Sequence, residues 1–587
     1  MKTAWRILLP GFLVLIFFSA GITLSVTNSN NDDERAHITA GYAYLVLNDY
    51  SFNREHPPLL KQLSALPLIL LDLSFPMDIY NVHGRKDISM EFMIGQRFLY
   101  EMGNDLDRML LYARIPNILI GALLGIFVFL YSRRLNGFWA GVLSLSLFAV
   151  SPNFIAHSSL VTTDTAVACF FFLTVYFLWR YFSTLRDRYI ILCGLSFGFT
   201  LVSKYNGLIM IPILYMLVPS AVFLFFNRGK SPGMRIRLSP VNLALAVLFA
   251  LTVSAKWSTK AMVPAVVLTV LAYLIPARFS SREKVHFSGK ILLFLLIIGF
   301  TIAMLDYTDL KGFPFHCPTK SYFEGFASFR GHSIGGHDAY LLGRFSSGGW
   351  WYYFPAAMFF KTPVASLVLM ILGFFALVKK KETLKNSLFF TLPPVVYLLV
   401  ACFVNNVNIG VRHVLAVYPF LFVVAGYCVS LFSGTSYKKI FNGILFLLVG
   451  LVVLSSIYTF PGCVSFINEL AGGYRNGYKY LGDSNISWGM DLKRLKKYLD
   501  DNNIIDFKIR ARFIPGAAPA YYGVPAFPIT SEEEKIPGKG VYIIDSSQLY
   551  MRDILWLDKV KPEAYIGGSL LVYRIDEKDR ERITGSY

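Results

Sequence analysis

The sequence predicts an α-helical polytopic membrane protein with a small α/β domain at its C-terminal end. Three observations indicate this fold class: an apolar composition, a series of hydrophobic segments separated by basic loops, and a change of composition near residue 460. Of the 587 residues, 55% are hydrophobic and only 16% are charged, and the mean hydropathy is +0.50. Soluble proteins carry about 25% charged residues, so a water-soluble core could not hide this much apolar surface.

The first hydrophobic segment, residues 7–26, is long enough to cross a bilayer as one helix. Lys2 and Arg6 precede it, and the polar run NSNNDDER follows where a cleavable leader would have small residues. Positive charges mark the cytoplasmic end of a span. We therefore expect an uncleaved first span with a cytoplasmic N-terminus, followed by a first outer loop at residues 28–107.

Short helices are expected within the first outer loop. Residues 34–47 have an amphipathic pattern, with Asn31 or Asp32 available as the N-cap. Residues 57–71 begin with two prolines and suit a helix that lies at the membrane interface. Residues 88–102 are expected to form a third helix.

Twelve further hydrophobic segments follow, some of them only about fifteen residues long. We expect each to be a membrane-spanning helix, which gives about thirteen spans in all. They cover residues 109–131, 138–152, 161–182, 189–203, 207–226, 240–255, 261–276, 291–305, 354–378, 387–404, 411–432 and 440–458.

The loops between these segments carry positive charge on alternate sides. Only Asp187, Glu283 and Glu382 oppose the basic residues of the loops assigned to the cytoplasm. The net charge of +19 therefore reports topology, and the expected partner is the lipid bilayer and not a nucleic acid. The basic residues are Arg133, Arg134, Arg180, Arg186, Arg188, Arg228, Lys230, Arg235, Arg237, Arg278, Arg282, Lys284, Lys290, Lys379, Lys380, Lys381, Lys385, Lys438 and Lys439.

An odd number of spans places the C-terminal end outside the cytoplasm, as expected for a multi-pass protein of the cell's inner (plasma) membrane. The chain then divides into a transmembrane domain, residues 1–460, and a soluble extracytoplasmic domain, residues 461–587, where charges of both signs are nearly balanced. The patterns in the soluble domain predict strands at 507–513, 541–545 and 564–575 and helices at 488–499 and 547–557.

Two adjacent carboxylates, Asp33 and Glu34, stand at the membrane surface directly after the first span. Asp164, in the sequence LVTTD, opens another span on the same outer face. A carboxylate in such a place can act as a general base, or it can cap a helix and balance its dipole. Further along the first outer loop, His56 and two prolines precede Lys61, and this run could contact a substrate or simply form a turn.

Several cations lie on the outer face, where the positive-inside rule disfavours them. Lys204 ends one span in the sequence VSKYNG, Arg412 lies in NNVNIGVRH, and Arg344 and Lys361 lie around the long outer loop. Each could snorkel to the interface or bind an anionic phosphate at the membrane surface. Their number on this face favours an anionic lipid headgroup.

The long outer loop, residues 306–353, is rich in glycine and aromatic residues and carries too little charge for a disordered segment. Its end, GWWYYFP with Tyr352, is either an interfacial aromatic belt or the lining of a sugar or lipid site. Cys317 and Cys463 lie on one side of the membrane and could form a disulfide. The sequence contains no GxxxxGK[ST], and no GxGxxG in a strand–helix context, so nucleotide-driven chemistry is not indicated.

The histidines of the outer loops could ligate a divalent metal together with carboxylates, but their spacing matches no metal motif. They are His56, His332, His337 and His413.

These features together resemble the GT-C superfamily of glycosyltransferases that use polyprenyl-phosphate sugars. They are most similar to glycosyltransferase family 39, with the protein O-mannosyltransferases and the lipid A aminoarabinose transferase. The segments GHDAYLLG, GWWYYFP, NIGVRHVLAVYPF and NELAGGYRNGYKYLGDSNISWGMDLKRL look similar to a bacterial and archaeal branch of this family. The β-trefoil insertion of the eukaryotic O-mannosyltransferases has no counterpart in the sequence, which puts their kind of protein acceptor in doubt. The matching elements are Asp33-Glu34, His56-Pro57-Pro58-Leu59 ahead of Lys61, Thr163-Asp164, and Lys204 near the outer end of the fifth span.

The resemblance implies a GT-C fold, a sugar donor on a polyprenyl phosphate, an extracytoplasmic acceptor (glycan, lipid or protein), inversion at the anomeric carbon, and no required cofactor or metal. It implies Asp33 as the general base, with Glu34 assisting it and Asp164 orienting acceptor or sugar. Lys204, with Arg412 or Arg344, would neutralise the leaving phosphate. The candidate substrate contacts are His56, Lys61, His337, His413 and Tyr352.

A transporter or flippase of polyprenyl-linked glycans is the alternative, because it would also need many spans and outer cations. Such a protein should show ionisable residues in mid-membrane, broken helices or inverted repeats. The sequence shows few charges within its spans and no obvious repeat. A structural subunit that binds partners through its tail would leave the adjacent acids and the His-Pro-Pro element unexplained, so a glycosyltransferase is the favoured hypothesis.

Overall fold

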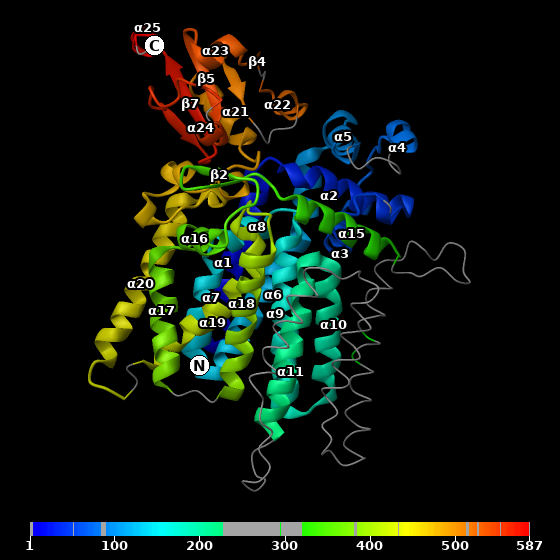
Figure 1. Cartoon of the computed structure of the whole chain (residues 1–587), viewed down its shortest axis with the longest axis vertical. Helices are drawn as coiled ribbons and strands as arrows, with labels where there is room; N and C mark the ends of the chain where they lie inside the picture. The colour runs from blue at the N-terminus through cyan, green and yellow to red at the C-terminus, as the bar shows by residue number, and fades with distance from the viewer. Residues whose placement is uncertain are drawn as a thin grey trace.

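The computed structural model describes residues 4–50, 52–83, 90–226, 320–380, 384–431, 434–511, 516–524, 527–551 and 553–585, together with Phe294 and Ile297. These residues form a helical bundle with a small mixed domain at one end, and the N-terminus lies toward the opposite end (Figure 1). The predicted spans at 240–255 and 261–276, and all but two residues of the span at 291–305, lie outside the described residues.

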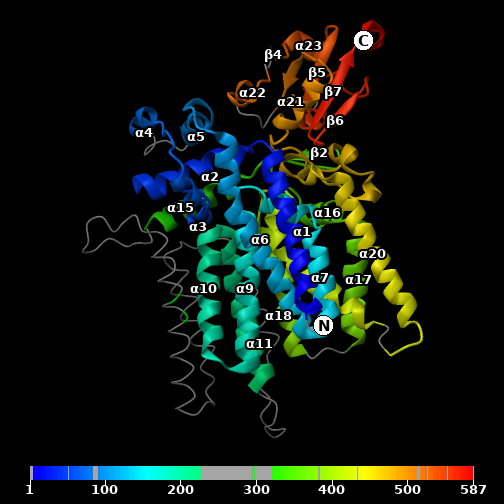
Figure 2. The ribbon, with the colours of Figure 1, turned by 180° about the vertical axis from the view of Figure 1, so that it is seen from behind.

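The bundle consists of apolar helices that run along the long axis of the molecule (Figures 1 and 2). Helix α9 is buried on nearly all sides, whereas α1 and α20 expose most of their apolar side chains at the edge of the bundle, as suits contact with lipid. The helices are α1 (Trp5–Thr27), α6 (Leu106–Asn136), α7 (Phe138–Ala149), α9 (Thr163–Thr184), α10 (Asp187–Ser203), α11 (Met210–Phe226), α17 (Val364–Lys379), α18 (Leu384–Val404), α19 (Tyr418–Ala425) between the 3-10 helices η7 (Val411–Val417) and η8 (Gly426–Ser430), and α20 (Lys438–Thr459).

Six helical segments in the described residues are long and apolar enough to cross a membrane. Two more qualify as bent pairs: α7 meets α8 (Pro152–Ser158) at 61°, and α16 (Tyr353–Phe360) meets α17 at 115°. The chain is therefore a multi-pass membrane protein, as predicted. The predicted number of thirteen spans is not confirmed, because the described residues hold at most eight.

The first outer loop forms short helices across the end of the bundle nearest the C-terminal domain (Figure 1). All three helices predicted there are confirmed, although each is divided or shorter than expected, and α4 is an addition. They are α2 (Asp32–Tyr42) with the π-helix η1 (Ala43–Leu47), α3 (Leu59–Ala65) with η2 (Leu66–Leu70), α4 (Met77–His83), and α5 (Glu91–Gln96) with the π-helix η4 (Arg97–Glu101).

The long outer loop has structure of its own in its described part, residues 320–353. Helix α15 (Lys320–Gly335) is followed by a hairpin of β1 (Ala339–Leu341) and β2 (Arg344–Ser346). The Tyr340 ring stacks on Tyr550 of the C-terminal domain at a centroid distance of 4.4 Å. Cys463 is buried and Cys317 lies outside the described residues, so their pairing stays a prediction.

The C-terminal domain is a five-stranded sheet in the order β4-β3-β5-β7-β6 with short helices around it. Strand β3 is parallel to β4 and β5, and β7 is antiparallel to β5 and β6. The predicted small α/β domain is therefore confirmed. Its elements are α21 (Leu492–Asp501), β3 (Lys508–Arg510), α22 (Ala518–Tyr521), β4 (Phe527–Pro528), α23 (Ser531–Lys535), β5 (Gly540–Asp545), α24 (Ser547–Met551), β6 (Ala564–Ile566), β7 (Leu570–Ile575) and α25 (Glu577–Thr584).

Both faces of the central strand β5 are buried, in different surroundings. Tyr542 and Ile544 pack into the core of the domain itself. Ile543 belongs to an apolar cluster that also contains Ile38 and Phe98 of the first outer loop. The C-terminal domain and the first outer loop therefore share a hydrophobic core, which fixes the domain over the end of the bundle.

Helices α2 and α3 pack so closely at Gly41 that no larger residue fits there. A Cβ atom at this position would lie 2.1 Å from the carbonyl oxygen of Lys61. We expect Gly41→Ala to lower the free energy of unfolding by about 1–3 kcal/mol, the usual cost of overpacking, in thermal or denaturant unfolding of the detergent-solubilised protein. Gly11→Ala is the control, because a Cβ there meets nothing within 4 Å. Equal stability of the two variants would contradict the packing.

Candidate active site

Helix α2 begins with a capping box that fixes the position of Asp33. The Asn31 side chain accepts a hydrogen bond from the backbone N–H of Glu34 (2.8 Å), and the Glu34 carboxylate accepts one from the backbone N–H of Asn31 (2.9 Å). This reciprocal pair satisfies two backbone donors at the helix start. Asn31 is thus the N-cap, one of the two residues predicted for this role, and Asp33 lies inside the box without capping the helix.

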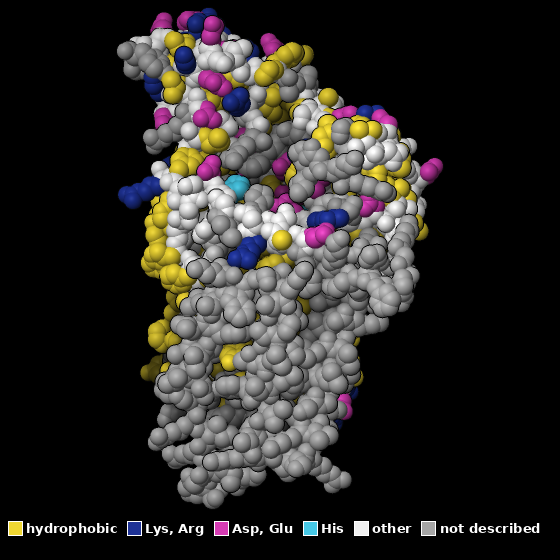
Figure 3. Space-filling model, turned by 45° about the vertical axis from the view of Figure 1, so that its right-hand side comes forward, with side chains coloured by type: hydrophobic (Ala, Val, Ile, Leu, Met, Phe, Trp, Pro, Cys, Tyr) yellow, Lys and Arg dark blue, Asp and Glu magenta, His cyan; other side chains and the backbone are white. Residues whose placement is uncertain are grey.

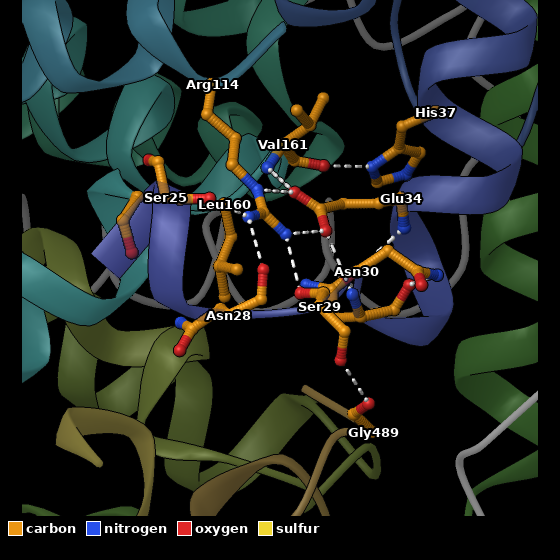
Figure 4. A network of polar contacts seen from close by, with 12 residues as sticks. Ser25, Asn28, Ser29, Asn30, Glu34, His37, Arg114, Leu160, Val161 and Gly489 are labelled. Carbon is orange, nitrogen blue, oxygen red and sulfur yellow. Dashed lines mark hydrogen bonds and ion pairs between the residues drawn. The ribbon is translucent and has the colours of Figure 1, made fainter. Parts of the chain in front are cut away.

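Glu34 also forms a fully buried ion pair with Arg114 of α6 (Figure 4). The Nε and Nη2 atoms of Arg114 donate to the two carboxylate oxygens at 2.8 and 2.7 Å. The backbone N–H of Val161 donates to the same carboxylate at 2.9 Å. The guanidinium also donates to carbonyl oxygens at 2.8–3.2 Å, namely those of Ser25, Asn28 and Ser29.

This network joins the end of α1, the start of α2, helix α6 and the loop before α9. Its hydrogen bonds occupy both oxygens of Glu34, whose side chain has no exposed surface. The geometry therefore favours a positioning role for Glu34, which holds the neighbouring Asp33 in place, over direct contact with a substrate.

Asp33, Arg412, Asp164 and Lys204 form a line of alternating charge, which we call the charged quartet. The Nη1 atom of Arg412 lies 2.9 Å from Oδ2 of Asp33 and 3.9 Å from Oδ2 of Asp164. The Nζ atom of Lys204 lies 2.6 Å from Oδ1 of Asp164. The fold thus brings together four of the residues predicted from sequence, from α2, α9, the end of α10 and η7.

The members of the charged quartet differ in exposure. The Asp33 side chain is 25% exposed, whereas those of Asp164 and Lys204 are only 1% and 3% exposed. Two carboxylates and two cations also balance in charge, which lowers the cost of burying them. Asp33 is therefore the carboxylate of the quartet that an incoming molecule can reach.

Four histidines lie within electrostatic range of the charged quartet: His37, His56, His157 and His413. The rings of His37 and His56 meet edge to face at 5.5 Å. His56, His157 and His413 each have one buried ring nitrogen without a hydrogen-bond partner in the described part of the chain. Buried polar atoms are normally paired, so these nitrogens suit contacts to a bound polar molecule.

The loop that carries His56 is held by Lys61. The fully buried Nζ atom of Lys61 donates to the carbonyl oxygens of Asn53 (2.5 Å) and His56 (2.8 Å) and to the hydroxyl of Tyr44 (3.2 Å). These contacts are all with the protein itself. They hold the backbone of His56 in place. Because the Lys61 ammonium already donates to three protein oxygens, the predicted contact of Lys61 with a substrate stays a prediction.

The predicted site residues of the long outer loop lie less close to the charged quartet. Arg344 is exposed in strand β2, and the described contacts do not link it to Lys204 or Arg412. Tyr352 precedes α16 and packs against Trp351 at 5.6 Å. His337 is near enough to His413 for their charges to interact. Among the residues that the structure describes, no three or more His, Cys, Asp and Glu side chains are arranged to hold a metal ion.

Several residues at the site were missed in the sequence, namely His37, His157, Arg114 and Trp488. Arg114 was detectable, because a single arginine inside a long apolar helix marks a functional or structural charge. Trp488, in the segment before α21, could not be assigned, because nothing local to it indicates that its ring lies under Arg412. The guanidinium carbon of Arg412 is 4.2 Å from the centroid of the Trp488 ring.

Acidic side chains gather in a recess on the face drawn in Figure 3, between the C-terminal domain and the first outer loop. A partly exposed carboxylate such as Asp33 can accept a proton, and the cations Arg412 and Lys204 can stabilise developing negative charge.

Comparison with known proteins finds a family match for part of the chain. A family model described as dolichyl-phosphate-mannose-protein mannosyltransferase matches residues 98–230. The matched stretch contains Arg114, Asp164 and Lys204. It confirms the resemblance to GT-C glycosyltransferases over these residues. No curated protein matches the sequence.

Three solved structures resemble the whole chain at low identity. ArnT from Cupriavidus metallidurans bound to undecaprenyl phosphate has 12% identity and a TM-score of 0.44, over 97% of this chain and 98% of that one. The Archaeoglobus fulgidus oligosaccharyltransferase in its apo form has 14% identity and a TM-score of 0.42, over 90% and 60%. The archaeal oligosaccharyltransferase AglB from the same organism, in complex with an inhibitory peptide and a dolichol-phosphate, has 12% identity and a TM-score of 0.42, over 98% and 75%.

Breaking the buried ion pair should be costly. Arg114→Met leaves the Glu34 carboxylate buried without its cation, so we expect a loss of about 3–5 kcal/mol in the free energy of unfolding. The double variant Glu34→Gln, Arg114→Met should recover part of that loss. Arg97→Met is the control, because its ion pair with Asp78 is largely exposed and should cost under about 1 kcal/mol. Denaturant unfolding in detergent measures all three, and equal losses for Arg97→Met and Arg114→Met would contradict the assignment.

Two histidines should make stability depend on pH. Burial lowers the pKa of His37, and burial together with the nearby Lys204 charge lowers that of His56. The unfolded chain therefore binds protons below pH ~6.5 that the folded chain does not, and stability falls as the pH drops, by up to about 1.4 kcal/mol per pH unit per histidine. We expect the thermal unfolding midpoint to decrease when the pH is lowered from 7.5 to 5.5, and to decrease less in His56→Asn. An equal fall in both proteins would exclude His56 as a source.

Proposed function

We propose that the chain is a membrane glycosyltransferase that moves a sugar from a polyprenyl-phosphate carrier to an extracytoplasmic acceptor. The observation that carries this proposal is the partly exposed Asp33 carboxylate beside Arg412, which Asp164 links to the second buried cation, Lys204. Transfer of a phosphate-linked sugar needs a base for the acceptor and positive charge for the leaving phosphate, and the charged quartet offers both. The family match over residues 98–230 supports the same class of reaction.

In the proposed reaction, an acceptor hydroxyl or amine attacks the anomeric carbon and gives its proton to the Asp33 carboxylate. The bond between the anomeric carbon and the phosphate oxygen breaks, and its electron pair stays on the polyprenyl phosphate. Attack and departure occur on opposite faces of the sugar, so the configuration inverts. Fixed charges that stabilise the developing phosphate charge supply a large part of such catalysis.

Arg412 links the two halves of this reaction. It holds Asp33 at 2.9 Å in the structure, and a guanidinium also binds phosphate oxygens strongly. A donor phosphate that binds Arg412 would draw the cation away from Asp33 and leave that carboxylate available to the acceptor. Lys204 would share the phosphate, while Asp164 keeps both cations in place from its buried position.

The surrounding polar groups would recognise the sugar and the acceptor. The unpaired ring nitrogens of His56 and His413 can hydrogen-bond to hydroxyl groups, with His337 and Tyr352 farther out toward the hairpin. In this proposal the charged quartet faces the extracytoplasmic side of the inner (plasma) membrane, with the C-terminal domain over it and the N-terminus in the cytoplasm.

A transporter is the competing class, and the bent helix pairs are a feature that it would share. Both bends lie near the site end of the bundle, where Asn153 of α8 donates to the carbonyl oxygen of Lys361 at 2.7 Å. They therefore lie toward one end of the bundle. A transport path would instead need ionisable groups near mid-membrane.

The assignment of Asp33 as the general base can be tested by replacing either of two adjacent aspartates with asparagine, which has nearly the same shape. We expect Asp33→Asn to lower sugar transfer by about 10²–10⁴-fold, the usual contribution of a general base, without loss of folding. Asp32→Asn is the control, because this adjacent carboxylate pairs with Arg35. Transfer is measured from undecaprenyl phosphates that carry labelled hexose or pentose to envelope extract of cells lacking the protein. Full activity of Asp33→Asn would exclude the base role.

A further inference from the structure

The segment before α21 contacts both halves of the site. We call residues 484–492 the bridging segment. On one side it binds the loop that leads into η7: the Ser484 hydroxyl donates to the carbonyl oxygen of Ile409 (2.9 Å), and the backbone N–H of Val411 donates to Oδ1 of Asn485 (2.9 Å). Arg412 is the next residue, so this side sets the position of the site's cation.

On its other side the bridging segment binds the chain just before Asp33. The backbone N–H of Ser29 donates to the carbonyl oxygen of Met490 (3.0 Å), and the Ser29 hydroxyl donates to that of Gly489 (3.2 Å; Figure 4). Ser29 lies two residues before the N-cap of α2. A single short segment therefore connects η7, which contains Arg412, with the start of α2, which contains Asp33.

The C-terminal domain holds the bridging segment in place. The Ser487 hydroxyl donates to Oδ2 of Asp545, at the end of the central strand β5, at 2.6 Å. The Asp545 carboxylate also accepts the backbone N–H of Ser547 at 2.7 Å. Since α21 continues directly from the segment, the sheet of the domain fixes it at both its middle and its end.

Trp488 is the residue of the bridging segment that touches the charged quartet. Its side chain is buried, and the Arg412 guanidinium carbon lies 4.2 Å from its ring centroid. The Arg412 side chain is itself only 10% exposed. A cation over an indole face is stabilised most when water is excluded from both, and the ring blocks the guanidinium from turning away from Asp33 on that side.

We propose that Trp488 is a positioning residue for Arg412, and that the C-terminal domain controls the geometry of the charged quartet through the bridging segment. The role of Arg412 toward a phosphate rests on the proposed function, whereas its placement by Trp488 does not. The domain would thus be part of the site's framework through this segment, although its sheet makes no described ion pair or hydrogen bond with the quartet.

The test compares Trp488→Phe, which keeps an aromatic face, with Trp488→Leu, which keeps apolar bulk only. The first readout needs no substrate: reaction of Arg412 with phenylglyoxal, followed by mass spectrometry. We expect modification of Arg412 to be about tenfold faster in Trp488→Leu than in Trp488→Phe, as the cation loses its partner. Trp556→Leu, which removes a buried indole elsewhere in the same domain, is the control for general loosening and should leave Arg412 as protected as in the native protein.

The second readout is transfer from an undecaprenyl-phosphate sugar. We expect Trp488→Leu to raise the donor KM about tenfold relative to Trp488→Phe, with a smaller change in kcat. The effect should largely disappear in an Arg412→Lys background, because an ammonium does not stack as a guanidinium does.

Each outcome separates the two proposals. Equal Arg412 reactivity in the two Trp488 variants, or losses that simply add to those of Arg412→Lys, would overturn the positioning role. If Arg412 is protected in the native protein and becomes reactive in Trp488→Leu, the positioning role is supported whether or not sugar is transferred. A native protein that transfers no sugar would overturn the proposed function and leave the positioning role standing.

Discussion

The Glu34–Arg114 ion pair is the constraint on which the rest of the site depends. Both side chains are removed from water, so each charge needs the other and needs every remaining hydrogen bond that the surrounding backbone supplies. Those bonds come from the end of α1, the start of α2 and the loop before α9. Few arrangements of these elements satisfy all of them, so the pair specifies where Asp33 and Asp164 lie relative to each other.

The adjacent carboxylates Asp33 and Glu34 thus lie in different environments. Glu34 turns inward to Arg114 of α6, while Asp33 is partly exposed and contacts Arg412. In a helix, neighbours in sequence point about 100° apart, which is enough to place one acid in the core and the other at its edge. One acid therefore serves the structure, and the other stays partly exposed, where the proposed base role requires it.

Much of this could be predicted from the sequence, and the limits have physical causes. Segment 7–26, the interfacial helices and the alternation in 541–545 appeared in the structure because composition and periodicity are local signals. Lys204 and Arg412 were found as cations on the face where the positive-inside rule disfavours them, and Asp33 and Asp164 as carboxylates beside predicted spans. Their pairing was not predicted, since Arg412 and Asp33 are 379 residues apart and no local pattern encodes such a contact. Trp488 was missed for the same reason, and Glu34 was read as a catalytic assistant because its partner Arg114 lies in another helix.

The bridging segment has a consequence for biosynthesis. Helix α2 leaves the ribosome early, Arg412 much later, and strand β5, which anchors the segment, later still. Membrane helices insert and soluble domains fold in the order of synthesis. Asp33 is therefore synthesised early, whereas under the proposed role of the bridging segment Arg412 would be held in place only after the C-terminal domain has folded. The proposed chemistry would then begin only once that domain is in position over the bundle.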